Sequence, residues 1–221
     1  APLPDPDLIE KAAKILGKSH QPMIFVGGGA YDACEEIKTL AETLQAPVIS
    51  YQNGRGILDE RHHLAHTNTA GAMLWENCDA AISIGCRMQA ERMSWGMDDA
   101  VKIIHIDIDP TEINRIMKPD VGLVSDAAIA SKKIINALKK YNIKRPSREE
   151  EMLNLKARAG KLMEEIAGPQ MGWLRAIRDV LPDNGLFVDE FTQVGYMSRV
   201  GFPVYNPRSM ITPGYQGTLG Y

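Results

Sequence analysis

The stretch PMIFVGGG, residues 22–29, is a short apolar run that ends in three glycines. Such a run is typical of a buried β-strand that enters a tight turn, because glycine accepts backbone angles that other residues avoid. Residues 34–44 then place apolar side chains at helical spacing and predict a helix. A strand, a glycine turn and a helix in this order predict one unit of an α/β sheet.

The alternation of strands and helices continues on both sides of this unit. Apolar runs predict further strands at residues 47–50, 79–85, 101–108 and 121–124, and helical spacing predicts helices at residues 7–16 and 127–140. Strands that alternate with helices form a parallel sheet with helices on both faces and right-handed crossovers. We therefore expect residues 1–142 to form a doubly wound, Rossmann-like α/β domain.

The remaining residues predict a linker and the start of a second α/β domain. Residues 143–168 are richly charged and indicate a linker that runs into a solvated helix. Within residues 169–221, helical spacing at 172–180 precedes an apolar strand at 186–189. The chain opens with a proline-rich linker and stops in a glycine-rich turn, so we expect it to be truncated at both ends.

Bulk properties exclude several classes of function. The 221 residues carry a formal net charge of −3, and the basic residues do not gather into one patch, so we expect no nucleic-acid partner. The sequence lacks an apolar run near the roughly 20 residues that span a bilayer, so we expect no membrane insertion. Cys34, Cys78 and Cys86 are scattered and show neither disulfide nor metal spacing. We expect a reducing, cytoplasmic setting.

Two patterns admit either a ligand or a structural role. Gly27, Gly28 and Gly29 could bring backbone N–H groups to a phosphate, or they could only close a turn, since the spacing is not GxGxxG. Asp107 and Asp109, in the segment HIDIDP at residues 105–110, end a predicted strand and could accept hydrogen bonds from a ribose. They could also cap a helix that starts near Asp109, and the residues alone favour the cap.

Charged side chains elsewhere leave similar alternatives. Arg87 follows a predicted strand and could pair with a diphosphate, but it could equally lie on the surface. His62, His63 and His66 raise the question of a metal site. Zinc sites need ligands that converge from a fixed frame, and here no cysteine or carboxylate completes the set. We favour a surface loop and assign no metal ligand.

Taken together, the segments resemble the middle domain of thiamine-diphosphate enzymes. The matching segments, in order, are Gly27-Gly28-Gly29, Ala46-Pro47-Val48, Gly54-Arg55-Gly56, residues 79–87, HIDIDPTEI at residues 105–113, and Asp126. The HIDIDPTEI segment is the most specific, and it is similar to the one in acetolactate synthase. Residues 186–197 and 212–221 resemble the first strand and the GxLG turn of the diphosphate-binding domain in the same family.

The resemblance implies thiamine diphosphate as the cofactor, with Mg²⁺. It places Thr192 and Gln193 near the diphosphate, Gly217 where the backbone meets the pyrimidine, and Leu219 as the apolar wedge under the bent cofactor. It also implies that the activating glutamate precedes Ala1 and that the Mg²⁺ ligands follow Tyr221. We therefore assign no catalytic residue here and expect this chain alone to be inactive.

The resemblance also implies a second cofactor site in the middle domain. FAD or ADP would be lined by Gly27, Gly28, Gly29, Arg87, Glu112, Ile113 and Asp126. Relatives that decarboxylate 2-oxo acids keep the same domain plan with no flavin, so both readings stay open.

The implied function is that of an acetolactate synthase-like enzyme of branched-chain amino acid biosynthesis. Such an enzyme decarboxylates a 2-oxo acid such as pyruvate and ligates the product to a second 2-oxo acid. A 2-oxo acid decarboxylase is the first alternative, and a nucleotide-binding regulatory module that uses the middle domain alone is the second. A homodimer or tetramer is expected, because one active site in this family is formed by two chains.

Overall fold

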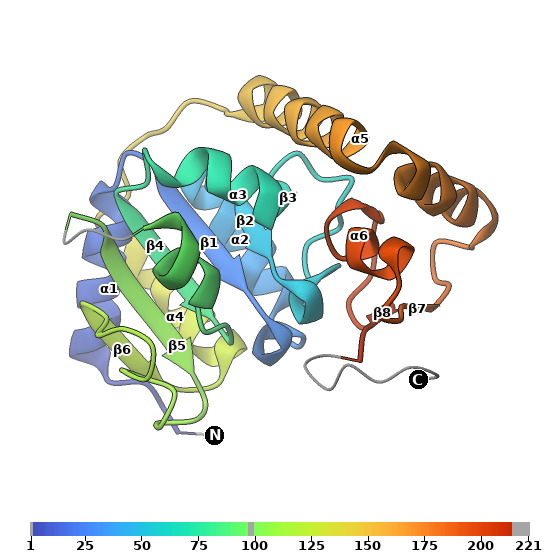
Figure 1. The fold of residues 1–221 in the computed structure, drawn as a ribbon. Helices are drawn as coiled ribbons and strands as arrows, with labels where there is room; N and C mark the ends of the chain where they lie inside the picture. The colour runs from blue at the N-terminus through green and yellow to red at the C-terminus, as the bar shows by residue number, and fades with distance from the viewer. Residues whose placement is uncertain (1, 97–99, 214–221) are drawn as a thin grey trace.

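The computed structural model describes residues 2–96 and 100–213. Within these residues the main feature is a six-stranded, entirely parallel sheet, called the large sheet below. Its strands are β1 (Pro22–Val26), β2 (Val48–Ser50), β3 (Ala65–Thr67), β4 (Ala80–Ile84), β5 (Lys102–Asp107) and β6 (Val121–Val124). They lie in the order β3-β2-β1-β4-β5-β6 (Figure 1). This is the order of a doubly wound sheet, so the predicted α/β fold class is confirmed.

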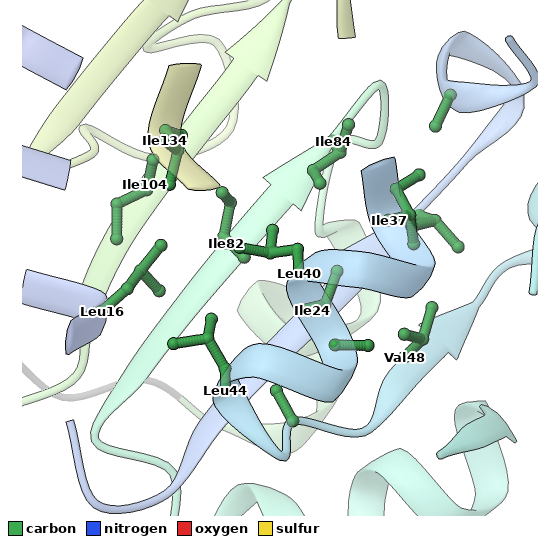
Figure 2. Packing of buried hydrophobic residues seen from close by; sticks show 14 of the residues in the cluster. Leu16, Ile24, Ile37, Leu40, Leu44, Val48, Ile82, Ile84, Ile104 and Ile134 are labelled. Atoms are coloured by element: carbon green, nitrogen blue, oxygen red, sulfur yellow. The ribbon is translucent and has the colours of Figure 1, made fainter. Parts of the chain in front are cut away.

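Three helices cover one face of the large sheet. They are α1 (Pro6–Lys18), α2 (Cys34–Leu44) and α4 (Ala127–Leu138). Alternate strand residues point to them, since successive side chains of a strand face opposite ways. Figure 2 shows the resulting core, in which fully buried side chains from the helices meet fully buried isoleucines from β1, β4 and β5.

The opposite face is smaller and more aromatic. It is covered by α3 (Asn68–Trp75) and by a single π-helical turn, η3 (Glu91–Trp95). The rings of Phe25 and Trp75 meet edge to face with centroids 5.8 Å apart, and Trp95 packs against both. Edge-to-face contact is a favourable arrangement for aromatic rings. With apolar cover on both faces, the large sheet is buried as parallel sheets require.

A long helix, α5 (Glu149–Val180), leads away from the sheet to the C-terminal segment (Figure 1). It kinks at Ala167, which has non-helical angles, two positions before Pro169. Proline removes a helical hydrogen bond and clashes with the preceding turn, which accounts for the kink. The two helices predicted around residues 143–180 are therefore continuous across a bend. The described residues include no helix with both the length and the apolar character needed to cross a membrane.

The C-terminal segment contains β7 (Phe187–Val188), α6 (Gln193–Gly201) and β8 (Met210–Ile211). β7 and β8 pair in parallel. Phe202 stacks on Phe187 with ring centroids 4.2 Å apart and joins a separate core with Leu174 of α5. The predicted strand at 186–189 is present in shortened form, and α6 is an additional element.

Two sequence predictions in the large domain were wrong. His66 was assigned to a surface loop, but it lies in β3 and is buried, followed at once by α3. β3 has three residues, too few for a readable alternation of apolar and polar side chains. The residues after Asp109 form turns rather than a helix, although Asp109 does accept hydrogen bonds from the backbone and the hydroxyl of Thr111.

The core makes a direct stability prediction. Ile82 on the central strand β4 is 0% exposed, so Ile82→Ala should lower the free energy of unfolding by about 2–5 kcal/mol through lost burial and a residual cavity. Leu153→Ala on the exposed side of α5, where the leucine is 48% exposed, should change it by less than about 0.5 kcal/mol. Urea titration of both variants measures the difference. Equal losses would contradict the assignment of this core.

Candidate functional site

The strand order reverses between β1 and β4, and this switch point defines the candidate site. In open α/β sheets, ligands bind outside the carboxyl ends of the strands at such a point. Here β1 runs into Gly27 and the turn η1 (Gly28–Ala30), and β4 runs into Gly85. The segments after β5 and β6 complete the same edge of the large sheet.

The glycines at the switch point let two backbones touch. A Cβ on Gly27 would lie 2.4 Å from the carbonyl oxygen of Gly85, and a Cβ on Gly29 would lie 2.8 Å from the Gly85 Cα. Gly85 itself has φ +56°, a left-handed angle that favours glycine. Gly28 is less crowded, with its nearest neighbour, Asn53, at 3.4 Å from an added Cβ. Two of the three predicted site glycines therefore serve packing between the β1 and β4 turns.

Arg87 and Glu112, predicted to line one site, are brought together as an ion pair. Arg87 donates from Nε and Nη2 to the two carboxylate oxygens of Glu112, each at 2.9 Å. Arg115 donates to the same carboxylate. Burial would raise the pKa of Glu112, but the hydrogen bonds from Arg87 and Arg115 outweigh it and hold that pKa below its usual range.

The other predicted residues of this edge have local structural roles. Asp126 caps α4 by accepting a hydrogen bond from the Ile129 N–H at 3.0 Å. Ile113 packs on β6, where its Cγ2 lies 2.6 Å from the place of a Cβ on Gly122. Among the described contacts, no hydrogen bond or ion pair joins Asp126 to Glu112.

His105 on β5 is a polar residue of this edge that was not predicted to line the site. Its ring is buried, and its Nε2 lacks a hydrogen-bond partner among the described residues. Burial lowers the pKa of His105, against the opposing charge of Asp107, whose Oδ2 lies 3.9 Å away. The lowered pKa favours the neutral imidazole, which lines a small cavity together with Arg87.

These contacts test whether a nucleotide fits the edge. Glu112 already accepts hydrogen bonds from Arg87 and Arg115 on its carboxylate, whereas Asp126 accepts from the Ile129 N–H with one oxygen. A Cβ on Gly28 would be in ordinary contact with Asn53 and Tyr31, at 3.4 and 3.5 Å, and the Arg87 side chain is 48% exposed. The cation on this edge that an anionic group can reach is thus Arg87.

The second predicted site lies at the start of α6. Thr192 caps this helix, with its hydroxyl accepting from the Gly195 N–H at 3.0 Å. The Gln193 side chain accepts a hydrogen bond from Gln170. The first N–H groups of a helix have no partner within it and form a positive end, which suits a diphosphate. Gly217 and Leu219 lie outside the described residues.

Comparison with known proteins decides the family. Residues 9–138, which cover β1 to β6 and the switch point, match a family described as thiamine pyrophosphate enzyme, central domain. The chain belongs to this family. The predicted resemblance to the middle domain of thiamine-diphosphate enzymes is therefore confirmed.

Similarity to individual relatives extends beyond the central domain. A probable acetolactate synthase large subunit from Methanocaldococcus jannaschii is 30% identical over 96% of this chain, and one from Methanococcus aeolicus is 31% identical over 98%. A probable 2-ketoarginine decarboxylase from Pseudomonas aeruginosa is 29% identical over 99%. The matches cover 39%, 41% and 40% of those proteins, so this chain spans about two fifths of their length.

Among the described residues, histidine, cysteine, aspartate and glutamate side chains do not form a group of three or more that could hold a metal ion.

Crowding at the switch point gives a paired prediction. Gly29→Ala should destabilise the fold by about 1–3 kcal/mol, because the new methyl group meets the Gly85 backbone. The same change at Gly160, within α5, meets nothing within 4 Å and should instead stabilise the helix by about 0.5–1 kcal/mol. Chemical denaturation of both variants checks the signs, and a stable Gly29→Ala would show that the two turns are loosely packed.

The ion pair gives a pH prediction. The folded pKa of Glu112 lies below its unfolded value, so its contribution to stability is complete above about pH 4.3 and is lost as the pH falls through the folded pKa. Glu112→Gln should therefore be less stable than the wild type at pH 7, with a difference that shrinks below about pH 4. Denaturation at several pH values measures this, with the exposed Glu150→Gln as the control. A pH-independent difference would contradict the assignment.

Proposed function

We propose that this chain is part of a thiamine-diphosphate-dependent enzyme that decarboxylates a 2-oxo acid such as pyruvate and ligates the product to a second 2-oxo acid. The observation that carries the proposal is the extent of the similarity. Acetolactate synthase large subunits match 96–98% of this chain, which includes α5 and α6 as well as the central domain. The remaining domains, with the activating glutamate and the Mg²⁺ ligands, would lie elsewhere in the longer protein, and residues 169–221 would begin its diphosphate-binding domain.

In this proposal the start of α6 holds the diphosphate end of the cofactor. The capped helix terminus with Thr192 and Gln193 supports this role, because it offers N–H donors and a positive potential. By resemblance, Gly217 contacts the pyrimidine and Leu219 supports the bend of the cofactor. The bound cofactor supplies the carbanion and the electron sink for decarboxylation. The residues of this chain bind it and orient it.

A nucleotide, FAD or ADP, would lie along the carboxyl edge of the large sheet. Gly28 would accept its close approach, and the exposed Arg87 would pair with its diphosphate. Gly27, Gly29, Glu112, Ile113 and Asp126 would shape the edge from beneath. We further propose a homodimer or tetramer and a cytoplasmic setting, which suits the free thiols of Cys34, Cys78 and Cys86.

A second function is favoured by one observation. The similarity to a probable 2-ketoarginine decarboxylase covers 99% of the chain at nearly the same identity. A decarboxylase would release an aldehyde instead of a ligation product. A stand-alone nucleotide-binding module is disfavoured, because the similarity continues through α6, for which such a module has no use.

Product analysis tests the proposal. The full-length protein, supplied with thiamine diphosphate, Mg²⁺ and pyruvate, should form acetolactate, which NMR identifies, and omission of thiamine diphosphate should abolish the product. Free acetaldehyde in its place would favour the decarboxylase. Loss of pyruvate without dependence on thiamine diphosphate would contradict both functions.

A further inference from the structure

Arg55 is a buried cation that the candidate site leaves unexplained. Its side chain is 1% exposed. It pairs with Glu60 through both carboxylate oxygens, donating from Nε to Oε1 and from Nη2 to Oε2, the second at 2.8 Å. The remaining donors reach backbone carbonyls about 145 positions later in the chain. A buried guanidinium that is hydrogen-bonded to a carboxylate and to backbone carbonyls fixes the position of those carbonyls.

The carbonyls that Arg55 holds belong to the end of α6. Nη1 donates to Arg199 at 2.6 Å and to Ser198 at 3.3 Å, and Nη2 donates to Phe202. The last carbonyls of a helix have no partner within it, and they form its negative end. The Ser198 carbonyl also accepts the Phe202 N–H at 3.1 Å, so Arg55 adds a donor for the Arg199 carbonyl and a positive charge at the C-terminus of α6.

Glu60 and Gly56 hold the chain that follows α6. The Val204 N–H donates to Oε2 of Glu60 at 3.0 Å, and the Glu60 N–H donates to the Val204 carbonyl at 3.2 Å. Gly56 has φ +79°, and a Cβ there would lie 2.1 Å from the carbonyl oxygen of Asn206. Residues 54–60 thus form a platform, called the Arg55 platform below, against which residues 198–206 are bonded and packed.

The same platform rests on the large sheet. A Cβ on Gly54 would lie 2.2 Å from the carbonyl oxygen of Val26, the last residue of β1. The Tyr51 N–H donates to that oxygen at 3.1 Å. One short loop therefore contacts the switch point of the central domain on one side and the end of α6 on the other.

We propose that Arg55 is a positioning residue for the cofactor, which it aligns by fixing α6. The inference rests on the proposed function, in which the opposite end of α6 holds the diphosphate. α6 has nine residues, so its two ends are only about 13 Å apart. A helix held at its C-terminus presents its N-terminal N–H groups in one place. Arg55 does not touch the cofactor in this proposal. The central domain sets the cofactor's geometry indirectly, because Arg55 fixes α6 and α6 binds the diphosphate.

Arg55→Lys tests this in the full-length enzyme. Lysine keeps the charge but offers three donors instead of five and lacks the planar fork that spans Glu60 and the α6 carbonyls. The matched control is Arg145→Lys. Arg145 also donates to carbonyls at a helix end, those of Leu16, Gly17 and Ser19, but that helix is α1, which packs on the large sheet beside α4.

The expected result is a rise of tenfold or more in the dissociation constant of thiamine diphosphate for Arg55→Lys, measured by calorimetry on folded protein. The KM for pyruvate at saturating cofactor should stay within twofold. Arg145→Lys should lower thermal stability but leave cofactor affinity unchanged. If Arg55→Lys does not fold, Glu60→Gln serves, with a rise of threefold or more expected.

Cofactor affinity within twofold of the wild type in these variants would overturn the inference, because a purely structural role lowers the folded fraction without changing the affinity of folded molecules. An equal loss of affinity in Arg145→Lys would overturn it as well. Absence of thiamine diphosphate binding by the wild type would overturn the proposed function, and this inference with it.

Discussion

The contact between the β1 and β4 turns is the constraint on which the rest of the carboxyl edge depends. These turns leave two neighbouring strands at the point where the chain changes direction across the sheet, and their backbones meet at Gly27, Gly29 and Gly85. A side chain at either of the first two would push the turns apart. The strands are paired along their whole length, so such a displacement would be passed to β2 and β5. The close approach therefore fixes where Gly28, Arg87 and the Arg55 platform lie.

Charge along this edge is balanced inside the protein. Glu112 forms ion pairs with Arg87 and Arg115, and Glu60 forms an ion pair with Arg55. Buried ions are tolerated when they are paired and hydrogen-bonded, and removal of one partner leaves the other uncompensated. The two pairs differ in access, since Arg87 keeps about half of its side chain exposed and Arg55 keeps almost none. Arg87 is thus suited to meet a ligand, and Arg55 is suited to hold the protein together.

The sequence predicted the fold well where apolar runs were long. The bounds of β1 and β6 were predicted to the residue, and α2 likewise, because their patterns are uninterrupted. β3 and α6 were missed: the first has three residues, and the second is interrupted by Gly195 and polar side chains that lower the helical signal. The resemblance supplied the family, which periodicity alone does not give.

The candidate site was less accessible from the sequence, since its partners are far apart along the chain. Arg87 and Glu112 are 25 positions apart and were assigned to the same ligand, and the structure shows that they bind each other, a contact that the sequence did not predict. Gly54-Arg55-Gly56 was recognised as a motif, but the carbonyls to which Arg55 donates lie about 145 positions away. Every residue has a backbone carbonyl, so the sequence does not indicate which carbonyls become partners. The burial of His105 likewise depends on packing that no local pattern reports.

The kinked helix α5 bears on how this enzyme class can be recombined. Before the kink, Met152 and Leu155 belong to the core of the large sheet, and after it Met171 and Leu174 belong to the core of the C-terminal segment. One helix is therefore shared by two hydrophobic cores, and the change from one core to the other falls between Ala159 and Met163, just before the bend at Ala167. A chimera joined in the loop before α5 would separate the large sheet from side chains that complete its core. A junction between Ala159 and Leu162 keeps both cores whole, so the natural unit of exchange ends inside a helix.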